Sequence, residues 1–83
     1  MTAAISAADT TFEAHRTLLF GVAYRMLGTI GEAEDAVQES YLRYRSAEAA
    51  IANSRAYLVT VVTRICLDVL KSARVQREQY IGQ

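Results

Sequence analysis

The chain has 83 residues, nine basic and nine acidic side chains, and a single cysteine. A chain of this length makes one domain with a small core, and one cysteine cannot form an internal disulfide. These features speak against a disulfide-stabilised secreted module. The first eleven residues lack the basic and apolar segments of a signal peptide, and no apolar run is long enough to span a bilayer. We therefore expect a cytoplasmic protein with no membrane partner.

Charge is divided unevenly along the chain. Residues 1–42 carry six acids and two arginines, a net charge of −4. Residues 43–83 carry seven bases and three acids, a net charge of +4. Such an asymmetry indicates different partners for the two halves, with nucleic acid or another acidic partner on the basic side.

Three helices are predicted, because proline is absent and apolar residues recur at helical spacing. An N-cap at Thr10, with Glu13 three residues later, forms a capping box that opens the first helix. This helix is expected to reach Leu27, where Gly28 stops it. Its apolar stripe consists of Phe12, Leu19, Val22, Ala23 and Met26.

Thr29 and Glu32 repeat the capping-box spacing and open a second helix, which is expected to end near Arg45. The short link makes the first two helices an antiparallel hairpin. The residues of the second helix that we expect to be buried are Ala33, Val37, Tyr41 and Tyr44.

Residues 46–55 have no strong periodicity and are expected to form a loop, with Asn53 as the N-cap of a third helix over about 54–79. The β-branched run 59–63 would also suit a strand, but the apolar spacing continues through Leu70, for longer than a typical strand. Apolar residues of this helix stand at positions 57, 58, 61, 62, 65 and 69. The predicted fold class is therefore all-α, a three-helix bundle made of a hairpin and a long third helix.

Polar residues of the second helix lie off its apolar stripe, where residues four apart share a face. Carboxylates in such a place are ordinarily solvated and are mildly stabilised near a helix N-terminus. Asp35 and Glu39 repel each other by about 0.2 to 0.5 kcal/mol, which a basic partner would relieve. This predicted outer face consists of Glu34, Asp35, Gln38 and Glu39.

One side of the third helix gathers Thr60, Arg64, Lys71 and Arg74. The plainest interpretation is a solvated surface on which Arg64 pairs with Asp68. Cations on one face can also bind phosphates in a salt-dependent way. Tyr57, beside the loop, is the aromatic residue best placed to stack on an unpaired base, a contact worth about 1 to 3 kcal/mol.

Catalytic chemistry has little support in the sequence. His15 has no carboxylate at the neighbouring helical positions, and Cys66 lies among apolar residues, where a core thiol is the usual role. No phosphate-binding glycine loop, nucleophilic triad or metal-ligand spacing is present. We expect neither an enzyme nor a cofactor or metal site.

Three blocks, at 19–28, 33–39 and 54–68, carry a family resemblance. In this order and spacing they resemble region 2 of the sigma-70 family, in its extracytoplasmic-function group, and are most similar to the actinobacterial sigma-J type. The resemblance covers roughly residues 12–80. It implies a flexible segment over 1–11, and it makes 81–83 the start of a linker to C-terminal domains that this chain does not contain.

By resemblance, the acidic helix docks on the clamp coiled coil of the largest catalytic subunit of RNA polymerase. Asp35, Gln38 and Glu39 would make the contacts, with Glu34 and Leu42 at the edge. An anti-sigma protein or a C-terminal domain of the same protein is the partner expected to regulate such a factor.

The resemblance also implies that the loop and third helix recognise the −10 promoter element and hold its non-template strand open. Tyr57 stands where the family usually has tryptophan, Arg64 where it often has asparagine, and Val69 where the sigma-J type often has a cation. Phosphate contacts would fall to Lys71 and Arg74. The residues implied in recognition are Asn53, Ser54, Arg55, Tyr57, Thr60 and Arg64.

A helical adaptor or oligomerisation module, which binds proteins and not DNA, is the alternative interpretation. In such a module the basic face would only be solvated. The two hypotheses differ in salt-dependent binding to single-stranded promoter DNA, which the adaptor would lack.

Overall fold

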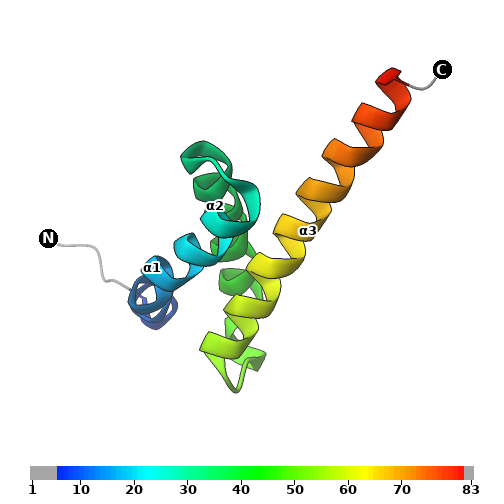
Figure 1. The fold of residues 1–83 in the computed structure, drawn as a ribbon. Coiled ribbons are helices and arrows are strands. Elements are labelled where there is room, and N and C mark those ends of the chain that lie inside the picture. The colour runs from blue at the N-terminus through cyan, green and yellow to red at the C-terminus, as the bar shows by residue number, and fades with distance from the viewer. Residues whose placement is uncertain (1–5, 82–83) are drawn as a thin grey trace, which may run out of the picture.

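The computed structural model describes residues 6–81, with side chains up to Gln79. Within this part the chain forms helices α1 (Ala7–Leu27), α2 (Ile30–Ala47) and α3 (Ser54–Ile81), with a short 3₁₀ helix, η1 (Glu48–Ala50), between α2 and α3. The three long helices pack against one another, and the end of α3 projects beyond the other two (Figure 1). The predicted all-α three-helix bundle is confirmed.

The turn between α1 and α2 forms as predicted. Gly28 adopts φ +87°, in the left-handed region that favours glycine, and its N–H donates to the Tyr24 carbonyl at 2.8 Å. Thr29 then caps α2, because its Oγ1 accepts the Glu32 N–H at 3.2 Å. The Glu32 carboxylate accepts from the Thr29 hydroxyl at 3.0 Å, in place of the backbone N–H of an ideal capping box.

The predicted start of α1 at Thr10 is wrong. Ser6 is the N-cap, and its Oγ accepts the Asp9 N–H at 3.1 Å. Thr10 lies inside the helix, where its hydroxyl donates to the Ser6 carbonyl at 3.3 Å. The earlier cap adds a turn that buries Ala8, and the carboxylate of Glu13 pairs with Arg16 at 3.0 Å. Residues 7–11 of the expected flexible segment are therefore helical, and residues 1–5 lie outside the described part.

One core holds the three helices together. Small residues on α2 let its neighbours approach closely, and the predicted apolar stripes of α1 and α3 point inward. Tyr41, Val22 and Met26 are only partly buried, at the border of the core. The buried apolar residues are Ala8, Phe12, Leu19, Ala23, Ala33, Ala36, Val37, Tyr44, Leu58, Val62, Ile65 and Cys66.

The predicted loop is shorter than 46–55, because α2 continues to Ala47 and η1 follows directly. Asn53 caps α3 as predicted, its Oδ1 accepting the Ala56 N–H at 2.9 Å. Helix α3 then extends to Ile81, past the predicted end at 79. Of the expected linker 81–83, residue 81 is thus helical, and 82–83 lie outside the described part.

Candidate functional site

The outer side of α2 presents the residues that the sequence assigned to a protein partner. Because Ala33, Val37 and Tyr44 turn inward, side chains about half a turn away face solvent. Leu42, at one end of this surface, is 49% exposed. Carboxylates beside an exposed leucine suit a partner surface that combines basic and apolar side chains. We call these five exposed residues the acidic face: Glu34, Asp35, Gln38, Glu39 and Leu42.

Arg43 already pairs with one carboxylate of the acidic face. Its Nε lies 3.2 Å from Glu39 Oε2, and the two side chains are 47% and 48% exposed. An exposed pair of this kind is worth about 0.3 to 0.5 kcal/mol. Glu39 can therefore exchange Arg43 for an external cation at little cost, and Arg43 meanwhile weakens the predicted repulsion between Glu39 and Asp35.

The support beneath the acidic face is closely packed. Ala33 and Ala36 are small, so the α2 backbone lies close to α1 and α3. Ser40, one turn after Ala36 on the same side of α2, is fully buried. The Ser40 hydroxyl donates to the Val37 carbonyl at 2.7 Å, so its buried polar group is satisfied. This packing fixes the backbone of α2 in the bundle, and with it the positions from which the outer carboxylates project.

Tyr41 links α2 to the first turn of α1, a contact that the sequence did not reveal. Its hydroxyl donates to Asp9 Oδ1 at 2.6 Å, and its ring meets Phe12 edge-on at 5.0 Å. The hydrogen bond from Tyr41 lowers the pKa of the Asp9 carboxyl and raises the pKa of the Tyr41 hydroxyl. Arg45 Nη1 donates to the same hydroxyl at 3.4 Å. This contact ties the early start of α1 to the helix that carries the acidic face.

The predicted loop residues lie together at the start of α3, but they differ in exposure. Asn53 and Arg55 are exposed and, with Ala56 and Val59, line a shallow hollow. The side-chain oxygen of Asn53 is occupied by its cap on Ala56. Ser54 is half-buried, and its Oγ lies 2.7 Å from the Tyr44 hydroxyl.

Tyr57 is half-buried one turn into α3. Its ring centroid lies 6.1 Å from that of Tyr44, at 51° between the ring planes. Tyr44 thus supports one side of the ring, and only the remainder is open to a ligand. Stacking on a base therefore stays a prediction for the exposed part of Tyr57.

Along α3, the four residues predicted to share a side are all exposed, and we call them the basic face: Thr60, Arg64, Lys71 and Arg74. The ion pair expected between Arg64 and Asp68 is not among those that the described residues form. Arg74 Nε instead lies 3.2 Å from Glu78 Oε2. That pair is well exposed and weak, so it leaves Arg74 able to bind a phosphate.

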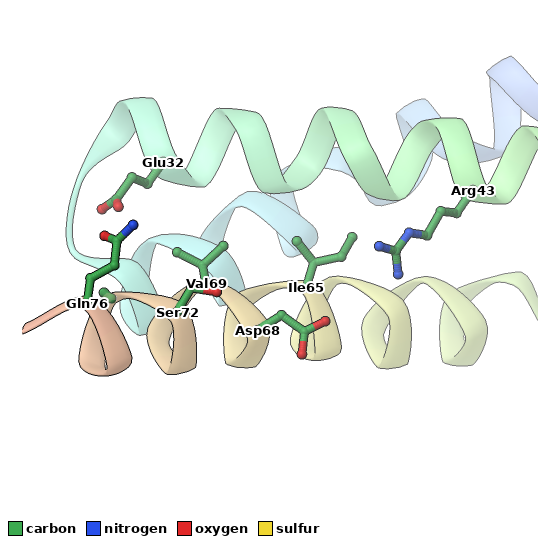
Figure 2. A pocket seen from close by; sticks show the side chains of 8 residues that line it. Glu32, Arg43, Ile65, Asp68, Val69, Ser72 and Gln76 are labelled. Atoms are coloured by element: carbon green, nitrogen blue, oxygen red, sulfur yellow. The ribbon is translucent and has the colours of Figure 1, made fainter. Parts of the chain in front are cut away.

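A groove between α2 and α3 lies beside the acidic face. Figure 2 shows Ile65 and Val69 of α3 on its floor, with Glu32 and Arg43 on the α2 side. A neighbouring hollow continues along Asp35 and Glu39. Spacing within one helix cannot predict a groove that two helices build together. Its lining residues are Glu32, Arg43, Ile65, Asp68, Val69, Ser72, Ala73 and Gln76.

The described residues contain no group of three or more His, Cys, Asp or Glu side chains that could hold a metal ion. Cys66 is fully buried, and burial raises the pKa of its thiol, which keeps it protonated and poorly nucleophilic. None of the helices described here, long as α3 is, has the length and apolar character needed to cross a membrane.

Comparison with known proteins identifies a family that the chain resembles. The family description "Sigma-70 region 2" matches residues 11–75. The ECF RNA polymerase sigma factor SigJ of Mycobacterium tuberculosis is 54% identical over 71 residues, which cover 86% of this chain and 23% of that protein. The probable ECF RNA polymerase sigma factor SigI of the same species is 45% identical over 69 residues, covering 82% of this chain and 24% of that protein.

The chain thus spans about a quarter of the length of these relatives. No solved structure gives a significant match.

Proposed function

The chain belongs to the sigma-70 family, as a region 2 domain of the extracytoplasmic-function group, and we propose that it is the promoter-recognition part of an RNA polymerase sigma factor. The observation that carries the proposal is that one helical bundle presents two surfaces of opposite charge. The acidic face lies on the outer side of α2, and the basic face lies on the outer side of α3. One domain can therefore hold a protein and a nucleic acid at the same time.

The acidic face is the proposed docking surface for the core polymerase. Its carboxylates offer charge complementarity to a basic helix, and Leu42 offers an apolar contact at the edge. The clamp coiled coil of the largest catalytic subunit is the partner that the family relationship suggests. Because α2 is fixed by its buried Ser40 and alanines, docking needs little rearrangement of this surface.

The start of α3 and the basic face are the proposed surface for the −10 element. Lys71 and Arg74 contact phosphates, while Asn53, Arg55 and Arg64 contact bases. The shallow hollow at Asn53 and Arg55 offers a place for an extruded base next to the exposed part of Tyr57. Capturing that base offsets the few kcal/mol that its extrusion costs. Polymerase and promoter meet in the bacterial cytoplasm, so the domain is proposed to act there.

The test is binding to both partners in one preparation. The chain should co-elute with bacterial core RNA polymerase in gel filtration, and its fluorescence anisotropy titration should show binding to single-stranded −10 oligonucleotides that weakens as salt rises. Co-elution without any DNA binding would instead support the adaptor, which the family relationship does not favour. A chain that binds neither partner would contradict the proposal.

A further inference from the structure

Helix α3 carries two exposed leucines, Leu67 on the side turned away from the bundle and Leu70 on the flank of the helix. Leu67 is 53% exposed and Leu70 is 42% exposed, whereas Leu58 on the same helix is fully buried. At about 100° per residue, Leu67 lies half a turn from Leu58 and points away from the core. Leu70 lies about 120° from Leu58, at the point from which every described side chain of α3 is exposed. Packing of the bundle therefore covers neither leucine.

Cations surround these leucines. Three of them stand three residues before, four after and seven after Leu67, the spacings that share a helix face. A fourth stands seven residues after Leu70. Leu67 is thus in the middle of the basic face. The four cations are Arg64, Lys71, Arg74 and Arg77.

The nearby acids do not cancel this arrangement. Glu78 is paired with Arg74 through an exposed contact of 3.2 Å. Asp68 lies four residues after Arg64 and three before Lys71, but it is in none of the ion pairs that the described residues form, and it lines the groove beside α2 (Figure 2). The surface around the two leucines is therefore positive.

An apolar patch framed by cations matches the chemistry of nucleic acid. Phosphates along a strand meet the cations, and sugars or thymine methyl groups lie between them at the level of the leucines. Isolated exposed leucines are common and need no partner, but Leu67 shares a helix face with Arg64, Lys71 and Arg74, and Leu70 precedes Arg74 by four residues and Arg77 by seven. A membrane-binding helix carries a broad apolar face, whereas Thr60 and Thr63 occupy part of this one.

We propose that Leu67 and Leu70 make apolar contacts with the promoter DNA that the basic face binds. This inference rests on the proposed function and adds a role for uncharged side chains. Phosphate contacts weaken with salt because they release counterions, whereas apolar burial releases none. The two leucines thus supply a part of the affinity that salt does not remove.

The test uses Leu67→Gln, Leu70→Gln and the double variant, because glutamine keeps the length and helix propensity of leucine while removing its apolar surface. Affinity for −10 oligonucleotides, single-stranded and duplex, is measured by anisotropy over a series of salt concentrations. The double variant should lose affinity roughly threefold to tenfold at every salt concentration, with an unchanged salt slope. Lys71→Gln should instead lower the slope by about 0.7 to 0.9.

The matched control is Ile30→Gln, which removes an apolar side chain that is 60% exposed at the start of α2. This control should bind DNA like the parent, and all variants should keep the helical circular dichroism. Parental affinity of the double leucine variant overturns the inference and leaves the proposed function standing. Binding of the double variant to core polymerase and to anionic vesicles is measured as well. If the double variant loses affinity for one of these and not for DNA, the inference is also overturned. Absence of DNA binding by the parent overturns the inference and the proposed function together.

Discussion

The acidic face and the basic face differ in what lies beneath them. The acidic face lies on α2. The inner side of this helix is buried at its alanines and Ser40, and Tyr41 links the helix to α1 through a hydrogen bond to Asp9. The basic face begins on the buried half of α3 and continues past Leu70, where every described side chain is exposed. The acidic face lies on a helix that is packed on its inner side, which favours recognition of a partner by shape. The part of the basic face beyond Leu70 lies on a helix exposed on all sides, which favours binding to a charged strand of variable form. The contrast can be tested at four places.

The largest effect on binding is expected at the acidic face. Asp35→Arg combined with Glu39→Lys should reduce affinity for core polymerase at least about 100-fold, because each reversal places like charges across an interface. Both side chains are exposed, so the helical circular dichroism should not change. Gel filtration with the core enzyme measures the effect. Glu13→Lys, an exposed reversal on α1, serves as the control, and undiminished co-elution of the double variant would remove the docking assignment.

The second effect distinguishes the two halves of α3. Leu58→Ala or Val62→Ala should lower the free energy of unfolding by about 1 to 4 kcal/mol, because each leaves a cavity in the core. Leu70→Ala, at a position 42% exposed, should change it far less. Urea unfolding followed by circular dichroism gives the three values. Equal losses at Leu58 and Leu70 would mean that the second half of α3 is also packed.

The third effect concerns sequence preference on the basic side. Asn53→Ala and Arg64→Ala should each lower the ratio of affinities for matched and scrambled −10 oligonucleotides by about fivefold or more, if each contributes one base contact. Anisotropy on the two single strands measures this ratio. Lys71→Ala provides the comparison, since loss of a phosphate contact weakens both strands alike. A ratio unchanged by both substitutions would leave the basic side as a sequence-independent platform.

The smallest effect is expected at the link between α1 and α2. The hydrogen bond from Tyr41 lowers the pKa of Asp9 in the folded state, so its contribution to stability is present above about pH 4 and is lost as the pH falls through the folded-state pKa. Tyr41→Phe should therefore lower the melting temperature at pH 7, and the difference from the parent should shrink at pH 3. A difference that stays constant with pH would show that Asp9 is not the reason for the loss.

Much of the fold follows from local chemistry that a sequence displays. Thr29 and Asn53 were predictable caps because their partners lie three residues away. Ser6 and Thr10 stand one turn apart as competing caps, and burial of Ala8 by the longer helix decides between them. The exposed sides of α2 and α3 follow from helical periodicity, which is why every predicted member of the acidic face and of the basic face is exposed in the structure.

Contacts between distant residues could not be predicted in this way. Tyr41 has helical spacing for the core, yet its hydroxyl finds Asp9 in another helix and stays at the border. Ser54 looks like an open loop residue, but the Tyr44 hydroxyl draws it inward. The groove lined by Ile65 and Val69 exists only because α2 and α3 lie side by side.

Cys66 offers a measurement that needs no introduced label. It is the single cysteine of the chain, it is fully buried on the inner side of α3, and burial raises the pKa of its thiol. A thiol reagent can reach it only while α3 is separated from the hairpin, so the labelling rate reports how often the bundle opens. When opening and closing are fast relative to labelling, that rate gives the opening equilibrium directly. Following the rate with polymerase, with promoter DNA and with both would show which partner holds the third helix closed.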